Sequence, residues 1–261
     1  MKNLKLLFGI IIGFVILLGC IIFADHYVGM LIVNPALNGI GEFAVRTLIL
    51  IGSCFFISKM YKKSVAPSTL NMTKGLFIYG ATVWIIIITN LFSEYKTPAL
   101  PASSVIPSLI GLFFGAMGTG LLEELVFRGF FFNAFTDRLG DSKKSIFASM
   151  FLSSSIFGLT HLINLISHPE LFVATISQVI YAILIGCIFC VIYYRTQNIW
   201  PGIILHGLID FTGKFWECFN PAPITDSSIL IAIIEVAVCL ILFVSAIVQL
   251  NKEFKNKEAA I

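Results

Sequence analysis

Three groups of polar residues interrupt an otherwise apolar chain, and their types are those that carry out proton-transfer chemistry. In order along the chain they are Glu123-Glu124 with Arg128, Phe157 with His161, and His206 with Asp210. Carboxylates and imidazoles accept and donate protons in enzyme active sites. Within a membrane such groups are costly, so they mark structural pairs or functional sites. These residues are therefore candidates for activating water, holding a metal ion or forming an ion path.

The spacing inside each group sets which side chains share a helix face. Glu124 and Arg128 are one turn apart, so Arg128 can neutralise Glu124 within one helix. Glu123 is rotated by about 100° from Glu124 and is expected to be free to act as a general base. His206 and Asp210 also share a face, where they could bind a metal or where the acid could orient the imidazole. Spacing and composition leave a protease, an ion-coupled transporter and a channel open.

The composition is that of an integral membrane protein. Of 261 residues, 58% are hydrophobic and 12% are charged, and the mean hydropathy is +0.96. In soluble domains about a quarter of the residues are charged. The net charge of +3 is no sign of nucleic-acid binding, because the basic residues follow the membrane topology. The six cysteines are expected to be buried apolar side chains, and Cys187 and Cys190 lack further metal ligands nearby.

The apolar runs predict an all-α, polytopic membrane protein with eight transmembrane helices. The expected spans are residues 4–23, 36–58, 75–93, 104 to about 133, 145–165, 171–194, 199–215 and 229–250. The first run is interpreted as an uncleaved anchor because its apolar core is long and no cleavage site follows. Without an internal repeat or a second domain, residues 1–261 are expected to form a single integral-membrane domain, with a motif-bearing core at about 104–217.

The basic residues give the expected orientation. Most of the 17 Lys and Arg residues fall in segments that lie on one side of an eight-span topology, and the other side holds only Lys96 and Lys214. The positive-inside rule then places both termini in the cytoplasm. Glu42 and Arg46, one turn apart in the second span, are expected to form a structural ion pair. Glu235 has no assigned role, and Arg46 is its one suggested partner.

Helix geometry predicts that the three polar groups lie at similar depths. At a rise of about 1.5 Å per residue, Glu123 is roughly 15–20 Å from the inner end of its span, and His161 is roughly 20–25 Å. The same count puts His206 at roughly 10 Å. Acid and imidazole groups from three spans could therefore converge in one pocket.

Together the three motifs resemble those of the CPBP family, which includes the CAAX prenyl proteases and the bacteriocin-processing enzymes also called Abi. The family pattern is Glu-Glu-x-x-x-Arg, then Phe-x-x-x-His, then His-x-x-x-Asn/Asp, each on its own transmembrane helix. Residues 123–129, 157–161 and 206–210 are similar to these motifs and follow the same order. The resemblance covers residues 120–211, whereas the first half of the chain is similar only in being hydrophobic.

The resemblance implies an intramembrane endopeptidase that opens to the cytoplasmic side. Glu123 with His161 would activate the attacking water, and His206 with Asp210 would stabilise the oxyanion or help to hold a metal. The implied catalytic residues are Glu123, Glu124, His161, His206 and Asp210, with Arg128 and Phe157 in support.

The need for a metal is left open by the resemblance, because family members have been described both as metalloproteases and as metal-free, glutamate-dependent proteases. A zinc ion would be held by Glu123, His161, His206 and Asp210. The CAAX branch commonly has Asn at the last motif position, whose amide can donate to an oxyanion, and ionised Asp210 cannot. Asp210 is therefore expected to be protonated, to orient His206 or to bind a cation.

The expected partners are the lipid bilayer and a membrane-associated peptide or protein substrate, in a bacterial cell membrane. A short peptide such as a bacteriocin leader is preferred to a CAAX substrate, so peptide maturation or self-immunity is the expected role. One alternative is a non-catalytic immunity or binding protein. Another is an ion-coupled transporter, which the absence of repeat symmetry and of paired broken helices disfavours.

Overall fold

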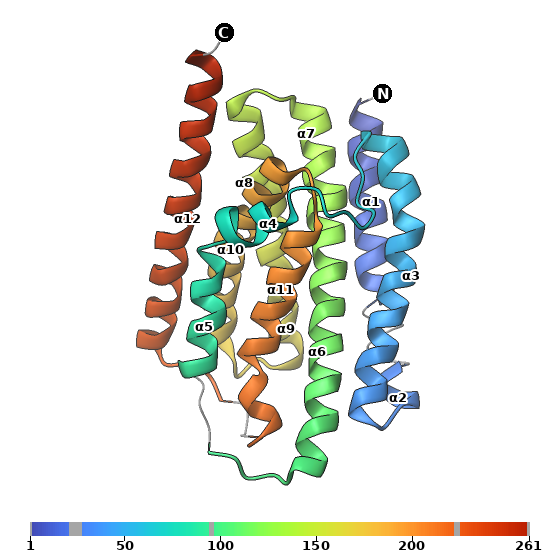
Figure 1. The fold of residues 1–261 in the computed structure, drawn as a ribbon, viewed down its shortest axis with the longest axis vertical. Coiled ribbons are helices and arrows are strands. Elements are labelled where there is room, and N and C mark those ends of the chain that lie inside the picture. The colour runs from blue at the N-terminus through green and yellow to red at the C-terminus, as the bar shows by residue number, and fades with distance from the viewer. Residues whose placement is uncertain (1, 21–27, 94–96, 222–224, 260–261) are drawn as a thin grey trace.

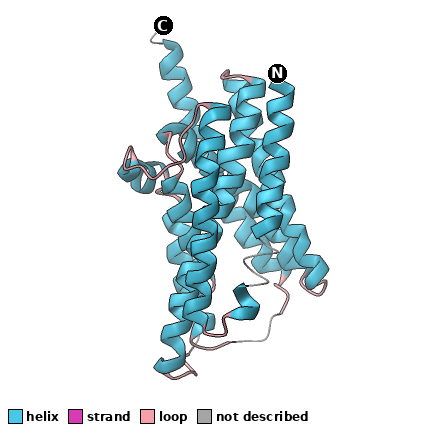
Figure 2. Cartoon of the chain, turned by 90° about the vertical axis from the view of Figure 1, so that its right-hand side faces the viewer, coloured by secondary structure: helices cyan, strands magenta, loops and turns pink. Residues whose placement is uncertain are grey.

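The computed structural model describes residues 2–20, 28–93, 97–221 and 225–259, and every regular element among them is a helix (Figures 1 and 2). The first half comprises α1 (Lys2–Cys20), α2 (Gly29–Leu31), α3 (Pro35–Tyr61), α4 (Met72–Lys74), η2 (Gly75–Tyr79), α5 (Val83–Ser93) and α6 (Ala102–Glu124). The second half comprises η3 (Leu125–Phe132), α7 (Asn133–Leu139), α8 (Lys143–Thr160), η4 (His161–Ile163), α9 (Asn164–Ser167), α10 (Phe172–Thr196), α11 (Trp200–Gly213), η5 (Phe215–Cys218) and α12 (Ile229–Ala259). The predicted all-α class is confirmed.

Five helical segments of the described chain are long and apolar enough to cross a membrane. They are Pro35–Tyr61, Ala102–Leu139, Lys143–Ser167, Phe172–Thr196 and Ile229–Phe254. A bent pair, Met72–Tyr79 with Val83–Phe92, raises the number to six if it counts as one span. The remaining predicted spans correspond to α1 and to α11, which has only 14 residues. Such a helix is about 21 Å long and shorter than the hydrocarbon core. Eight spans therefore remain a prediction.

The third predicted span is broken, which corrects the expectation of one continuous helix over residues 75–93. Its first part ends with the π-helix η2 at Tyr79, which Gly80 caps, and α5 then continues at an angle of 66°. A Cβ at Gly80 would lie 2.4 Å from the Leu205 side chain on α11, so this corner requires the absence of a side chain. A transporter of the expected kind would have paired broken helices, and the described chain contains one such bent span and not two.

The helices form an upright bundle in which α1 begins and α12 ends at the same end (Figure 1). Helix α10 is the most enclosed candidate span, whereas α12 lies at the edge and packs mainly on α10. Close packing of α3 on α6 depends on a glycine pair, because a Cβ at Gly39 would lie 2.1 Å from the Gly111 carbonyl oxygen. Small residues of this kind let membrane helices approach closely.

The helix that carries the paired glutamates changes its winding directly after them. Helix α6 ends at Glu124, and the π-helix η3 follows before α7 continues the same 38-residue rod. Phe127, Phe130 and Phe131 of η3 are fully buried in the main hydrophobic core. π-Helical turns within α-helices are frequent at functional sites. The sequence predicted the long rod but not this change in winding.

Two predictions about charged residues have different outcomes. The ion pair between Glu42 and Arg46 is present, with 3.5 Å between Oε2 and Nη2. The suggested pairing of Glu235 with Arg46 is wrong. Glu235 on α12 accepts a hydrogen bond from the Ser177 hydroxyl of α10 at 3.0 Å, and α12 and α3 lie on opposite sides of the bundle (Figure 1).

The N-terminus of α11 is fixed by the loop that follows α3. The Asn198 side-chain amide donates to the carbonyl oxygens of Ser68 and Leu70 at 3.0 and 2.8 Å. Its oxygen accepts a hydrogen bond from the Trp200 backbone N–H at 3.1 Å. The Trp200 indole in turn donates to the Val65 carbonyl oxygen at 3.2 Å. These contacts fix the position of α11 along its axis, and therefore the positions of His206 and Asp210.

Candidate active site

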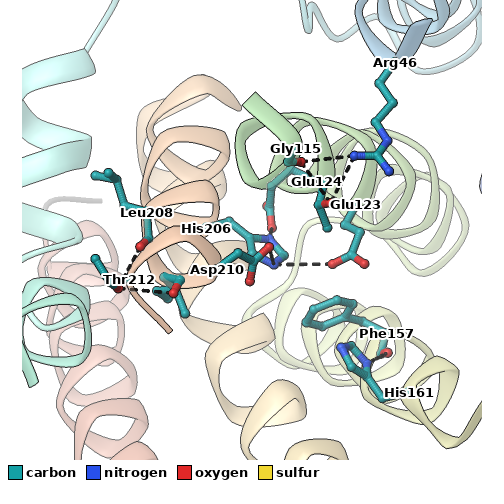
Figure 3. Close-up of polar contacts among 12 residues, drawn as sticks. Arg46, Gly115, Glu123, Glu124, Phe157, His161, His206, Leu208, Asp210 and Thr212 are labelled. Carbon is teal, nitrogen blue, oxygen red and sulfur yellow. Dashed lines mark hydrogen bonds and ion pairs between the residues drawn. The ribbon is translucent and has the colours of Figure 1, made fainter. Parts of the chain in front are cut away.

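The structure brings two of the three polar motifs into direct contact, at the end of α6 and the middle of α11 (Figure 3). His206 Nδ1 lies 2.9 Å from Glu124 Oε1. On the other edge of the ring, His206 Nε2 lies 3.3 Å from Glu123 Oε2 and 3.9 Å from Asp210 Oδ2. One imidazole therefore faces three carboxylates, two from α6 and one from its own helix.

Glycines at the crossing allow α6 and α11 to approach closely enough for these contacts. A Cβ at Gly120 would lie 2.7 Å from the Gly207 backbone nitrogen, and one at Gly207 would lie 2.6 Å from the Met117 side chain. At Gly202, a Cβ would lie 3.1 Å from Glu124 Oε2. Larger residues would separate the two helices and move His206 away from both glutamates.

Glu124 and Arg128 form the predicted pair in a fully enclosed position. Arg128 Nη1 lies 2.9 Å from Glu124 Oε1, and Nη2 donates to the Gly186 carbonyl oxygen of α10 at 2.9 Å. The guanidinium lies between two rings, with Cζ 5.1 Å from the centroid of Phe157 and 5.3 Å from that of Phe189. Aromatic faces attract cations electrostatically. Arg128 therefore connects η3, α8 and α10 around the Glu124 carboxylate.

The ring of His206 is held in position by the same two aromatic residues. It stacks on Phe189 with a centroid distance of 5.2 Å and an interplanar angle of 18°. Phe157 meets it edge-on at 5.7 Å. With Nδ1 directed at the Glu124 carboxylate, the proton on that nitrogen is fixed, and Nε2 is left to face Glu123 and Asp210.

The two adjacent glutamates differ sharply in accessibility. The Glu124 side chain is 1% exposed and the His206 side chain 8%, whereas those of Glu123 and Asp210 are 21% and 33% exposed. The Glu124–Arg128 side of the imidazole is therefore enclosed, and the Glu123–Asp210 side is partly exposed. The division in which Glu123 acts as the base and Glu124 supports the site stays a prediction.

His161 lies beside this group but does not join it directly. It begins the 3₁₀-helix η4 at the end of α8, and its Nδ1 lies 3.1 Å from the Phe157 carbonyl oxygen. Its ring meets the Phe157 ring edge-on at 5.1 Å, so Phe157 contacts both imidazoles (Figure 3). The contacts found for His161 in the described structure include no hydrogen bond or ion pair to Glu123 or His206. Glu123 thus contacts His206 directly, and its joint action with His161 on a water molecule stays a prediction.

The side chains as arranged do not fit a preformed metal site. Among the described residues, no group of three or more His, Cys, Asp or Glu side chains could hold a metal ion. The Nδ1 atoms of both imidazoles are engaged, His206 with Glu124 and His161 with a backbone carbonyl. Zinc binding by Glu123, His161, His206 and Asp210 therefore stays a prediction from the resemblance, and no chemical step below depends on a metal.

Sequence reasoning missed three contributors to the site. The contact of Glu124 with His206 joins residues 82 positions apart, which spacing within one helix cannot reveal. Phe189 lies in the middle of an apolar run and carries no signal at all. Arg46 did carry a signal, as an arginine within a predicted span, and its guanidinium points to α6 on the side from which Glu123 projects (Figure 3).

Comparisons with known proteins agree with the motifs. Residues 105–212 match the family model described as type II CAAX prenyl endopeptidase Rce1-like. Searches of curated proteins and of solved structures each found no match. The matched segment begins in α6 and ends in α11, so it contains all three motifs and every contact of the imidazole described above. With several helices apolar enough to span a bilayer, this is a multi-pass membrane protein. The match of residues 105–212 therefore supports the resemblance of this chain to the CPBP family of intramembrane peptidases.

Proposed function

We propose that this protein is an intramembrane endopeptidase that hydrolyses a peptide bond with a water molecule activated by Glu123. The matched family is one of CAAX-protease-type hydrolases. The observation that carries the proposal is the accessible Glu123 carboxylate, 3.3 Å from an imidazole whose opposite edge is fixed by buried Glu124. A purely structural polar cluster has no need of an exposed carboxylate on one side and an enclosed one on the other.

The enclosed half of the site prepares His206 for its role. Arg128 holds the Glu124 carboxylate, and Glu124 accepts a hydrogen bond from the Nδ1–H group of His206. Asp210, 3.9 Å from Nε2, favours a second proton on the ring. In this state the Nε2–H group is a charged donor in a site of low dielectric, where such a donor stabilises developing negative charge most strongly.

The proposed reaction begins with Glu123 taking a proton from water as the oxygen attacks the carbonyl carbon of the scissile bond. The carbonyl π electrons move to its oxygen, and His206 Nε2–H donates a hydrogen bond to this oxyanion. When the intermediate collapses, the carbon–nitrogen bond breaks and the proton held by Glu123 passes to the leaving amine. General base catalysis of this kind contributes about 10²–10⁴-fold in rate. His161 is proposed to hold the attacking water on the side of Phe157.

Two substrate classes follow from the family assignment. The matched family is described by its CAAX prenyl endopeptidases, so a C-terminal peptide with a prenylated cysteine is one candidate. A leader or pheromone peptide anchored in a bacterial cell membrane is the other, and its cleavage would serve peptide maturation, bacteriocin processing or self-immunity. Both present a peptide bond close to a lipid-embedded group, which the position of the site among membrane helices requires.

The test is hydrolysis of fluorogenic peptides of both classes by purified protein in lipid nanodiscs. Glu123→Gln should lower kcat/KM by about 10²-fold or more, because the amide cannot take the proton from water. Glu235→Gln is the matched control, since it replaces an intramembrane carboxylate on α12 and should retain activity within about threefold of wild type, as expected away from the site. Full activity of Glu123→Gln, or no cleavage of either peptide class by the wild type, would refute the proposal.

A further inference from the structure

Arg46 of α3 lies outside the matched segment but contacts the helix that carries Glu123. Its side chain is buried, and Nη1 donates to the Gly115 carbonyl oxygen and to Thr119 Oγ1, each at 3.1 Å. Figure 3 shows the guanidinium reaching α6 on the side of Glu123. An arginine held within a membrane helix is costly, and its contacts indicate why it is there.

The position of these contacts along α6 determines what they can do. Thr119 lies one helical turn before Glu123, so fixing the turn from Gly115 to Thr119 fixes the direction in which Glu123 projects. Directly after Glu124 the helix changes from α to π winding. The glutamate pair is thus bracketed by two arginines, with Arg128 beyond it and Arg46 before it.

We infer that Arg46 is a positioning residue for the proposed peptidase reaction: by holding the turn from Gly115 to Thr119 and placing positive charge beside Glu123, it directs that carboxylate to His206. The inference rests on the proposed function and extends it to a residue that the three motifs do not include. Arg46 makes no proton transfer and touches no reacting atom. Its effect is on the geometry of the general base.

The competing explanation is that Arg46 only neutralises Glu42, as the spacing on α3 predicted. In that ion pair Arg46 Nη2 lies 3.5 Å from Glu42 Oε2, and Glu42 is 19% exposed. Arg46 also donates two hydrogen bonds to α6, so neutralising Glu42 does not account for all of its contacts. The two explanations differ in what should happen when both residues on α3 are replaced by uncharged ones. Such a double replacement leaves no unpaired carboxylate, but it does not restore the contacts to α6.

The experiment compares Arg46→Met, Glu42→Gln and the double variant in nanodiscs, with kcat, KM and the thermal unfolding midpoint measured for each. Arg46→Met should lower kcat about 10–100-fold and change KM by less than about threefold, since a displacement of about 1 Å costs up to about 10²-fold. Glu42→Gln alone should behave like the wild type, and adding it to Arg46→Met should not restore kcat. Recovery of the double variant to within about threefold of wild type would overturn the inference, because such recovery is the mark of a removed buried charge.

Two milder variants keep the test informative if Arg46→Met does not fold. Arg46→Lys keeps the charge but loses the planar fork that reaches two acceptors at once, and it should retain more activity than Arg46→Met. Thr119→Val removes one acceptor and should lower kcat several-fold, roughly the value of one hydrogen bond, at an unchanged unfolding midpoint. Wild-type kcat in both variants would overturn the inference.

Failure of this inference is distinguishable from failure of the proposed function. A wild type that cleaves peptides while Glu123→Gln does not establishes the reaction, whatever the Arg46 variants do. Under that result, unaffected Arg46 and Thr119 variants refute only the positioning role. A wild type without any peptidase activity refutes the proposed function, and the inference about Arg46 fails with it.

Discussion

Replacing Arg128 with methionine tests how much the buried Glu124–Arg128 pair contributes to stability and how much to activity. Arg128 is completely buried, pairs with Glu124 at 2.9 Å and donates to the Gly186 carbonyl oxygen at 2.9 Å. Methionine fills similar space but supplies neither charge nor donors. The Glu124 carboxylate would then be left with His206 as its one remaining described partner, and a helix carbonyl would lose its second hydrogen bond.

The expected cost follows from these contacts. Breaking a buried pair by removing one partner typically costs about 3–5 kcal/mol, because the other charge stays buried without compensation. Interactions between membrane helices are generally weaker than this, at about 0.6 kcal/mol on average for hydrogen bonds. The higher range applies here because Glu124 is enclosed and Arg128 contacts two aromatic rings as well as the carboxylate. We therefore expect Arg128→Met to lower the free energy of unfolding by about 3 kcal/mol.

The assay is unfolding in mixed micelles by titration with a denaturing detergent, followed through the fluorescence of the three tryptophans. The informative comparison is the double variant Arg128→Met/Glu124→Leu, in which both charges are gone. Apolar replacement of a whole buried pair is often neutral or stabilising, so the double variant should recover most of the lost stability. It should not recover activity, because Nδ1 of His206 has lost its acceptor. A single variant that loses less than about 1 kcal/mol, or a double variant no more stable than the single one, would refute this account of the pair.

Three further predictions concern other parts of the structure. Gly120→Ala should lower both the stability and the activity of the protein, because its methyl group would lie 2.7 Å from the Gly207 backbone nitrogen. An unfolding titration and the peptidase assay measure the two effects, and wild-type stability and activity would contradict the close crossing of α6 and α11. Asp210→Asn should keep activity within about tenfold of wild type, since an amide can donate to the oxyanion, whereas Asp210→Leu should lose more; equal kcat/KM for the two would argue against a polar role for this residue. The Asp226 carboxylate accepts hydrogen bonds from the backbone N–H groups of Val173 and Ala174, and these bonds lower the pKa of the carboxyl. The stabilisation of the first turn of α10 is therefore complete above the ordinary carboxyl pKa of about 4, and it is lost as the pH falls through the lowered pKa. Amide exchange should show constant protection factors for that turn from neutral pH to about pH 5 and a decline only below about pH 4, and a decline already at pH 6 would contradict the assignment.

Interactions within one helix were predictable from the sequence, because regular winding fixes which side chains meet. The pair Glu42–Arg46 forms within α3 as its four-residue spacing indicates, and Glu124–Arg128 forms although the winding changes from α to π between the two residues. The breaks and changes in winding themselves were not predictable. The bend after Gly80 depends on a side chain of α11, which is far away in the sequence. The π-helix after Glu124 has no recognisable local signal either.

For contacts between helices, the sequence indicated which residues lie in the same layer, but not which of these residues touch one another. The depths of Glu123, His161 and His206 suggested one polar layer, but helix rotation decides which atoms touch within a layer. The glycine contacts between α6 and α11 set this rotation, and they direct His206 to both glutamates at once. Phe157, expected from the sequence to support the site, contacts both imidazoles edge-on.

The two consecutive glutamates have opposite environments because one residue of helix turns a side chain by about 100°. Glu124 faces α10 and α11, where Arg128 and His206 meet its carboxylate away from solvent. Glu123 faces the open side and touches the same imidazole through its other nitrogen. A single residue, His206, therefore contacts both the enclosed carboxylate and the proposed general base. Any change that alters the relative rotation of α6 and α11 should affect both halves together, which is the reason that the crossing glycines and the turn held by Arg46 matter as much to the proposed chemistry as the motif residues.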